Sequence, residues 1–273
     1  MGHYNSIENW VDDLPKIGKS VFSKETIVKQ FPNMSPNAIK ISLYRLVKKK
    51  KIRSVWRDFY AVILPEYGLK GVPPVMVYID QLMKHLDKNY YLALLSAAEI
   101  HGASHQTPME SYVITNSRIL RDKQKGSVKI NFITKKRISS NFVTKIMVRS
   151  GYVNVSSPEL TAVDMLIYEK SVGGINRVAT VLYELAENIK LKNITEEFLK
   201  SQNTPIIQRL GYLFEFLGYE ELSEKLFEKA KKSGLMFRKS PLTTLSKQKN
   251  YSACPINEKW KIIINEEIEI DEL

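Results

Sequence analysis

The chain has 273 residues, of which 44% are hydrophobic, and this length suits one or two folded domains rather than a disordered tail. Its 41 lysines and arginines outweigh 29 acidic residues, and the net charge of +12 favours an acidic partner such as nucleic acid. The single cysteine, Cys254, excludes an internal disulfide and a cysteine-rich zinc site. The sequence has no apolar run of membrane-spanning length and no secretory leader, which favours a cytoplasmic protein.

Two short helices are predicted near the N-terminus. The segment 7–14 has helical character and ends before Pro15. Ser23 is a good N-cap for a second helix, which runs through Phe31. The residues that follow, 32–34, then break the chain.

A longer amphipathic helix is predicted next. Ser35 caps it, and Pro36 lies in its first turn, where a missing N–H does no harm. One side is apolar and consists of Ile39, Leu43, Leu46 and Val47. The opposite side and its flanks carry Asn37, Lys40, Ser42, Tyr44, Arg45 and Lys48. The recognition helix of a helix-turn-helix needs this division, with one side packed and the other facing a major groove.

A strand-turn-strand pattern over 52–63 completes the prediction of a winged helix-turn-helix, with this segment as the wing. Twelve lysines or arginines lie between Lys16 and Arg57, against one acidic residue, Glu25. Such an imbalance is the expected footprint of phosphate binding, although a lysine run alone also suits a solvated helix end. We therefore predict DNA contacts from the polar helix face, with phosphate contacts from Lys48, Lys49, Lys50, Lys51, Arg53 and Arg57.

The rest of the chain is expected to be a mixed α/β domain rich in helices, which makes the whole an α+β protein. Pro65 to Pro74 is a loop by composition, a helix follows over 75–86, and we place the domain boundary there, giving domains 1–85 and 86–273. Further helices are predicted over 90–101 and 157–170 and near 195–201, 205–217 and 219–233, and another helix beyond Gly173 and Gly174 carries Val178, Val181, Leu182 and Leu185. Strands are predicted over 112–115, 129–134, 143–149, 152–155, 235–238 and 260–264.

Three stretches carry a family resemblance. They are RLVKKKKIRSVWRDFYAV (45–62), YYLALLSAAEIHGASHQTP (90–108) and SSPELTAVDMLIYEKSVGGINRVATVLYELAENI (156–189). Their order and spacing resemble the AbiEi family of bacterial antitoxins.

The resemblance implies the antitoxin of a type IV toxin–antitoxin pair, encoded in one operon and associated with abortive infection by phage. It implies an N-terminal domain that binds inverted repeats in double-stranded DNA of its own promoter and represses the operon. It also implies a C-terminal domain that antagonises a nucleotidyltransferase-like toxin without forming a stable complex with it. No cofactor, catalytic residue or metal ion is expected.

A basic stretch, a histidine pair and three acidic residues in the second domain each have more than one interpretation. The basic stretch 118–149 either extends the DNA footprint, binds RNA or an acidic toxin surface, or decorates solvent-facing strands. The pair His101 and His105 has metal-ligand spacing, but Gly102 and Pro108 favour loop hydrogen bonds instead. The acids Glu159, Asp164 and Glu169 are expected to be solvated or to compensate a helix dipole.

Two alternative functions remain. A winged-helix transcription factor that senses a ligand, without a toxin partner, fits a mixed α/β domain that lacks catalytic clusters. A nucleic-acid-processing enzyme would need clustered acids and a lysine on adjacent strands to hold Mg²⁺. Neither 112–115 nor 129–134 contains an acid, so the enzyme is the weaker alternative.

Overall fold

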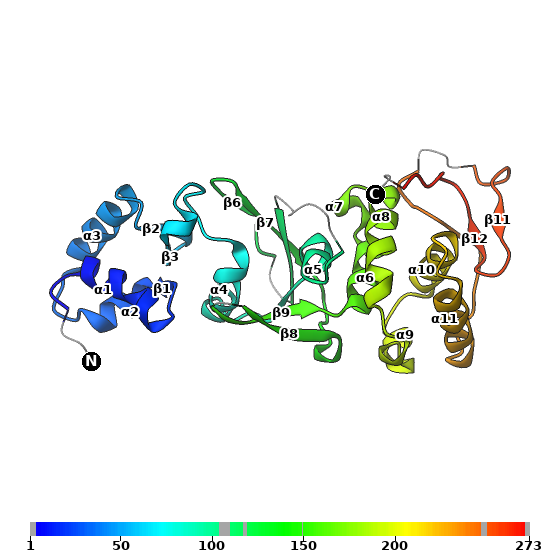
Figure 1. Cartoon of the computed structure of the whole chain (residues 1–273), viewed down its shortest axis with the longest axis horizontal. Coiled ribbons are helices and arrows are strands. Elements are labelled where there is room, and N and C mark those ends of the chain that lie inside the picture. Colours follow the sequence, from blue (N-terminus) through cyan, green and yellow to red (C-terminus); the bar gives the residue numbers. More distant parts are fainter. Residues whose placement is uncertain (1–3, 104–109, 117–118, 149, 247–249, 271–273) are drawn as a thin grey trace. The chain divides into compact units, whose positions relative to one another are not determined.

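The structure is a computed structural model that describes residues 4–103, 110–116, 119–148, 150–246 and 250–270. The chain divides into two compact units (Figure 1). Unit 1 comprises Met1–Tyr91, Met109–Ile138 and Lys145–Asn154. Unit 2 comprises Leu92–Pro108, Ser139–Thr144 and Val155–Leu273. The prediction of a mixed α/β protein is confirmed.

The N-terminal part of unit 1 contains three helices and a small antiparallel sheet with the strand order β1-β3-β2. Its elements are α1 (Ile7–Asp13), β1 (Val21–Ser23), α2 (Lys24–Gln30), α3 (Pro36–Lys48), β2 (Ile52–Trp56) and β3 (Phe59–Val62). The predicted caps form: the hydroxyl of Ser23 accepts a hydrogen bond from Thr26 N, and that of Ser35 from Ala38 N, both at 3.2 Å. The sequence had not indicated β1, a strand of only three residues.

A separate hydrophobic core holds these elements together. It is formed by buried side chains from α1, β1, α2, α3, β2 and β3, which include Ile7, Trp10, Phe22, Ile27, Ile39, Leu43, Leu46, Ile52 and Val62. The ring of Trp10 lies edge-on to that of Phe22, with centroids 5.2 Å apart. Three of the four predicted apolar residues of α3 are fully buried, and Val47 packs against the core as a half-buried side chain. The apolar side of α3 is therefore fixed against its neighbours.

A six-stranded mixed sheet follows in the order β6-β7-β5-β4-β9-β8. Its strands are β4 (Tyr90–Leu92), β5 (Glu110–Thr115), β6 (Lys123–Lys125), β7 (Val128–Thr134), β8 (Val143–Val148) and β9 (Gly151–Ser156). β5 pairs with β7 in parallel and β6 with β7 in antiparallel register.

Two helix predictions were wrong at their start. Residues 90–92 form β4, and only Leu94–Ile100 is the helix α5, because three fully apolar residues suit a buried strand as well as a helix. The predicted helix 75–86 is a 3-10 turn, Val75–Val77, followed by α4 (Ile79–His85). The loop predicted between 115 and 129 contains the short strand β6.

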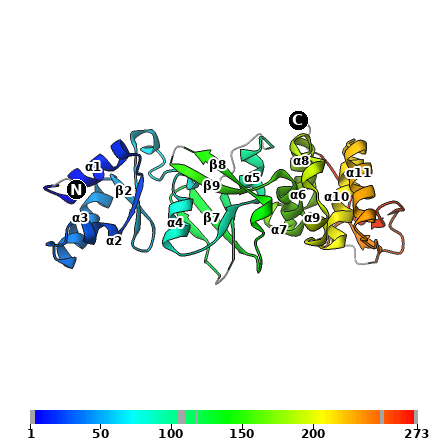
Figure 2. The same ribbon diagram turned by 90° about the horizontal axis from the view of Figure 1, so that it is seen from below.

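Unit 2 is mainly helical, and α6 lies in contact with α5, α8 and α10. Its helices after α5 are α6 (Pro158–Ile167), α7 (Glu169–Val172), α8 (Ile175–Leu185), α9 (Glu196–Lys200), α10 (Thr204–Phe216) and α11 (Glu220–Lys232). Figures 1 and 2 show α10 beside α11. The predicted C-terminal strands are displaced and shorter: β10 (Ser240–Pro241), β11 (Ile256–Asn257) and β12 (Ile262–Ile263).

The acids of α6 and α7 are buried, so the expectation that they are solvated was wrong. The carboxylate of Glu169 forms an ion pair with Arg209 of α10 and accepts a hydrogen bond from the hydroxyl of Thr243. The carboxylate of Glu159 accepts hydrogen bonds from Lys190 N at 2.9 Å and from Asn193 Nδ2 at 3.0 Å. These acids join segments distant in the sequence, a role that local sequence patterns do not indicate.

Within the described ranges, no helix combines the length and the apolar character that crossing a bilayer requires.

Candidate nucleic-acid interface

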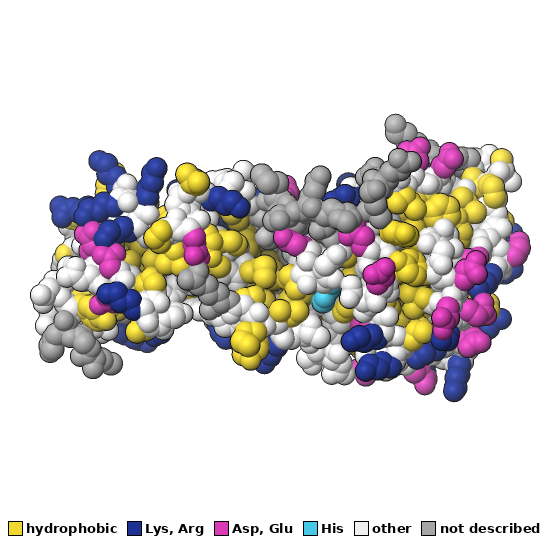
Figure 3. All heavy atoms as spheres, viewed as in Figure 1, with side chains coloured by type: hydrophobic (Ala, Val, Ile, Leu, Met, Phe, Trp, Pro, Cys, Tyr) yellow, Lys and Arg dark blue, Asp and Glu magenta, His cyan; other side chains and the backbone are white. Residues whose placement is uncertain are grey.

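The polar side of α3 forms a basic surface of unit 1. Asn37, Lys40, Arg45 and Lys48 are exposed, and the ring of Tyr44 projects into solvent with 69% of its surface exposed. Ser42 is half-buried. Figure 3 shows lysine and arginine side chains gathered over this helix. Every polar residue predicted on this side is therefore at least partly accessible.

Several of these cations are not paired with an acid of the described segments. In the part of the chain that the structure describes, no ion pair involves Lys40, Arg45, Lys48, Lys50 or Arg53. A surface cation that is not paired with an acid can bind an incoming phosphate without first breaking an ion pair. The arrangement therefore suits a polyanion.

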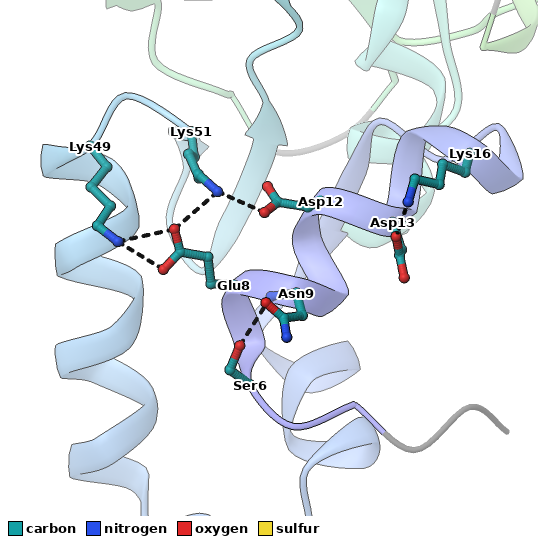
Figure 4. A network of polar contacts seen from close by, with 8 residues as sticks. All are labelled: Ser6, Glu8, Asn9, Asp12, Asp13, Lys16, Lys49 and Lys51. Atoms are coloured by element: carbon teal, nitrogen blue, oxygen red, sulfur yellow. Dashed lines mark hydrogen bonds and ion pairs between the residues drawn. The ribbon is translucent and has the colours of Figure 1, made fainter.

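Lys49 and Lys51 behave differently, because they form ion pairs with α1 (Figure 4). The ammonium of Lys49 lies 2.8 Å from Glu8 Oε2, and that of Lys51 lies 2.9 Å from Glu8 Oε1 and 2.6 Å from Asp12 Oδ2. Hydrogen bonds from Lys49 and then Lys51 hold the pKa of Glu8 below its ordinary value. The same network raises the pKa of Lys51, mainly through Asp12.

These pairs join α1 to the residues after the C-terminal end of α3. Two of the residues predicted to contact phosphates, Lys49 and Lys51, therefore have a structural role that the sequence did not predict. The spacing of the two acids indicates this role: Glu8 and Asp12 are four residues apart on the predicted first helix, so both lie on one face of that helix.

The β2–β3 hairpin places two further predicted residues. Arg53 is half-buried on β2, and Arg57 is exposed in the two-residue turn, with its guanidinium 3.8 Å from Asp58 Oδ2. Asp58 takes a positive φ of 56°, and its carbonyl accepts a 2.8 Å hydrogen bond from Lys24 N. The turn is therefore fixed to the start of α2.

A groove of about 370 Å³ separates α3 from the hairpin. Lys40 and Tyr44 line it from α3, and Ser54 and Tyr60 line it from the hairpin. The lining combines a cation, hydroxyl groups and aromatic rings, which are the kinds of side chain that contact phosphates, sugars and base edges in protein–DNA complexes. Tyr60 had not been singled out from the sequence.

The basic stretch 118–149 contains residues in different environments. The ammonium of Lys123 lies 4.9 Å above the centre of the Trp56 ring, and that of Lys129 lies 2.9 Å from Glu110 Oε1. Arg118 and Arg149 lie outside the described residues. The stretch is therefore only partly free to bind an anion.

Two other candidate sites receive less support. His101 Nε2 donates to the carbonyl of Ser156 at 2.7 Å, and His105 lies outside the described residues. Within the described segments, no three histidine, cysteine or acidic residues gather in a way that would hold a metal ion. An acid and a lysine do meet on adjacent strands, Glu110 and Lys129, because β5 begins two residues earlier than predicted.

Comparison with solved structures places the chain in a known class of mixed α/β fold. The crystal structure of the RV2827C protein from Mycobacterium tuberculosis aligns with a TM-score of 0.68 and 15% sequence identity, covering 94% of this chain and 90% of that one. No curated protein matches the sequence.

A second similarity comes from a family model. Residues 91–216 match the model of the AbiEi antitoxin C-terminal domain, so this part of the chain is similar to that domain. This match confirms the resemblance noted in the sequence. It begins after β3 and α4, so α3 and the hairpin lie outside it.

Proposed function

We propose that the chain is a DNA-binding antitoxin that represses its own operon and counters a nucleotidyltransferase-like toxin, as in type IV systems of abortive infection. In this proposal residues 1–85 are a winged helix-turn-helix that binds inverted repeats in double-stranded promoter DNA. Residues 86–273 supply the antitoxin activity, without catalysis, a cofactor or a stable complex with the toxin.

The observation that supports DNA binding best is the basic side of α3 described above. Its apolar side is buried and its polar side is accessible, as a helix in a major groove requires. The β2–β3 hairpin lies next along the chain and shares a groove with α3, which suits a wing.

The contacts that we propose fall into two groups. Asn37, Lys40, Ser42, Tyr44 and Arg45 face bases or the adjacent backbone, since asparagine pairs with adenine and lysine or arginine with guanine. Lys48, Lys50, Arg53 and Arg57 contact phosphates. Lys49 and Lys51 act mainly by holding α3 against α1, because their ammonium groups are already paired.

The antitoxin function is tested by co-expressing the full-length chain with the adjacent open reading frame and scoring growth. We expect rescue by the wild type and by a Lys40→Ala/Arg45→Ala/Lys48→Ala variant, because these changes lie outside the antitoxin domain. Failure of the expressed wild type to rescue cells from a demonstrably toxic neighbour would exclude the antitoxin function. A ligand-sensing winged-helix regulator would then be the better account.

Repression is tested separately with a reporter gene behind the native promoter. The wild type is expected to lower expression, and the triple variant is expected to lose this effect while still rescuing growth. Repression that persists in the triple variant would contradict the proposed DNA face.

A further inference from the structure

A second groove lies beside the proposed DNA face. It has a volume of about 590 Å³ and opens between α2, the β2–β3 turn and the C-terminal end of α4, all of them in unit 1. This volume is within the range of small-molecule sites, roughly 300–1,000 Å³. The DNA proposal makes no use of the α4 side of this groove.

The wall of the groove is apolar and held in place. It includes Val28, Trp56, His85 and Leu86. The Trp56 ring lies edge-on to Phe132 at 5.7 Å, while the His85 ring lies 5.1 Å from that of Phe59. These contacts limit the positions of both rings before any ligand arrives, which reduces the entropy lost on binding.

The rim of the groove is positively charged. Lys24, Lys29 and Arg57 line it, against Glu25 and Asp58. No ion pair within the described ranges involves Lys24 or Lys29. Arg57 forms one ion pair with the acids that the structure describes, the 3.8 Å contact with Asp58, and 94% of its side chain is exposed. A mainly apolar and aromatic wall beside these cations is complementary to an aromatic ring that carries a negative charge.

We propose that this groove binds a small aromatic anion, such as an aromatic carboxylate, and that its occupation weakens the binding of DNA. The ring would stack against Trp56 or His85, and the carboxylate would pair with Lys24, Lys29 or Arg57. The effect on DNA rests on the proposed function. Lys24 and Asp58 line both grooves, so an anion bound here neutralises positive charge next to α3.

Binding is tested on the full-length protein with salicylate as the probe and tryptophan fluorescence as the signal. Trp10 and Trp260 are buried, whereas Trp56 is half-buried in the groove, so a saturable change is expected from Trp56 and should disappear in Trp56→Phe. Absence of a saturable change in the wild type would overturn the proposal.

Two variants with the same charge change provide the matched comparison. Val28→Asp places a carboxylate in the groove and should weaken salicylate binding about tenfold or more, because like charges repel. Ile17→Asp changes another exposed apolar residue of unit 1 outside the groove and should bind like the wild type. Equal affinities of all three folded proteins, with folding checked by circular dichroism, would overturn the site.

The regulatory step is tested by fluorescence anisotropy with a labelled promoter duplex. Salicylate at a concentration that nearly saturates the wild type should lower the DNA affinity of the wild type several-fold and that of Val28→Asp by a clearly smaller factor. If salicylate binds but the DNA affinity of the wild type does not change, the regulatory step is overturned. If no DNA binds at all, the proposed function fails, while the fluorescence titration still decides whether the groove is a ligand site.

Discussion

The division of the basic residues into free and paired cations leads to a quantitative prediction about DNA binding. Lys40, Arg45 and Lys48 are exposed on α3 and form no ion pair among the described residues, whereas Lys49 and Lys51 pair with Glu8 and Asp12. Each phosphate neutralised by a cation lowers the slope of log K against log[salt] by about 0.9. Removing three free cations should therefore flatten the slope by about 2.7.

This change is large enough to measure. Between about 50 and 200 mM salt, a slope difference of about 2.7 corresponds to roughly 40-fold in affinity. The wild type should therefore lose roughly 40-fold more affinity over this range than Lys40→Ala/Arg45→Ala/Lys48→Ala. Fluorescence anisotropy with the promoter duplex, at four or more salt concentrations, measures both slopes.

The control is the double variant Lys49→Ala/Lys51→Ala. It removes two positive charges instead of three from an adjacent part of the chain, but from residues that are already paired, so its slope should stay close to that of the wild type. Thermal unfolding of both variants shows whether the loss of the α1 pairs has loosened the module. Equal flattening by the double and triple variants would refute the distinction between free and paired cations.

Three further predictions concern stability. Arg209→Met leaves the buried carboxylate of Glu169 without its partner and should cost about 3–5 kcal/mol in urea unfolding, whereas a loss under about 1 kcal/mol would contradict the buried pair. Gly211→Ala places a methyl group against the indole of Trp260, and should lower the free energy of unfolding by about 1–3 kcal/mol. The ion pairs lower the pKa of the Glu8 carboxyl, so this carboxylate stabilises the fold fully above its ordinary pKa of 4.5. The stabilisation is lost as the pH falls through the lowered pKa. Glu8→Gln should therefore reduce the dependence of the melting temperature on acid pH, measured in a pH series of thermal melts.

Local rules predicted most of the helices. Ser23, Ser35 and Ser157 each accept a hydrogen bond from the backbone N–H three residues later, as their positions before helical segments indicate. Such signals lie within one turn of the chain and need no knowledge of distant residues. The start of α3 at Pro36 and of α6 at Pro158 follows from the same rules.

The failures arose where distant residues decide the outcome. Tyr90–Leu92 is a strand because other strands pair with it, although its composition fits a buried helix. Glu169 is buried because Arg209, forty residues later, neutralises it. Since the sequence does not show which segments meet, an acid in a helix is expected to be solvated by default.

The lysine run shows how these two kinds of information combine at the candidate site. Four successive lysines at a helix end cannot all face one partner, because side chains along a helix turn by about 100° per residue. α3 ends at Lys48, and the chain then turns so that Lys49 and Lys51 reach Glu8 and Asp12. The acids of α1 thus compensate part of the positive charge on one side of the module. Much of the charge left uncompensated lies on the polar side of α3, so the proposed orientation on DNA depends on α1 as well as on the basic residues themselves.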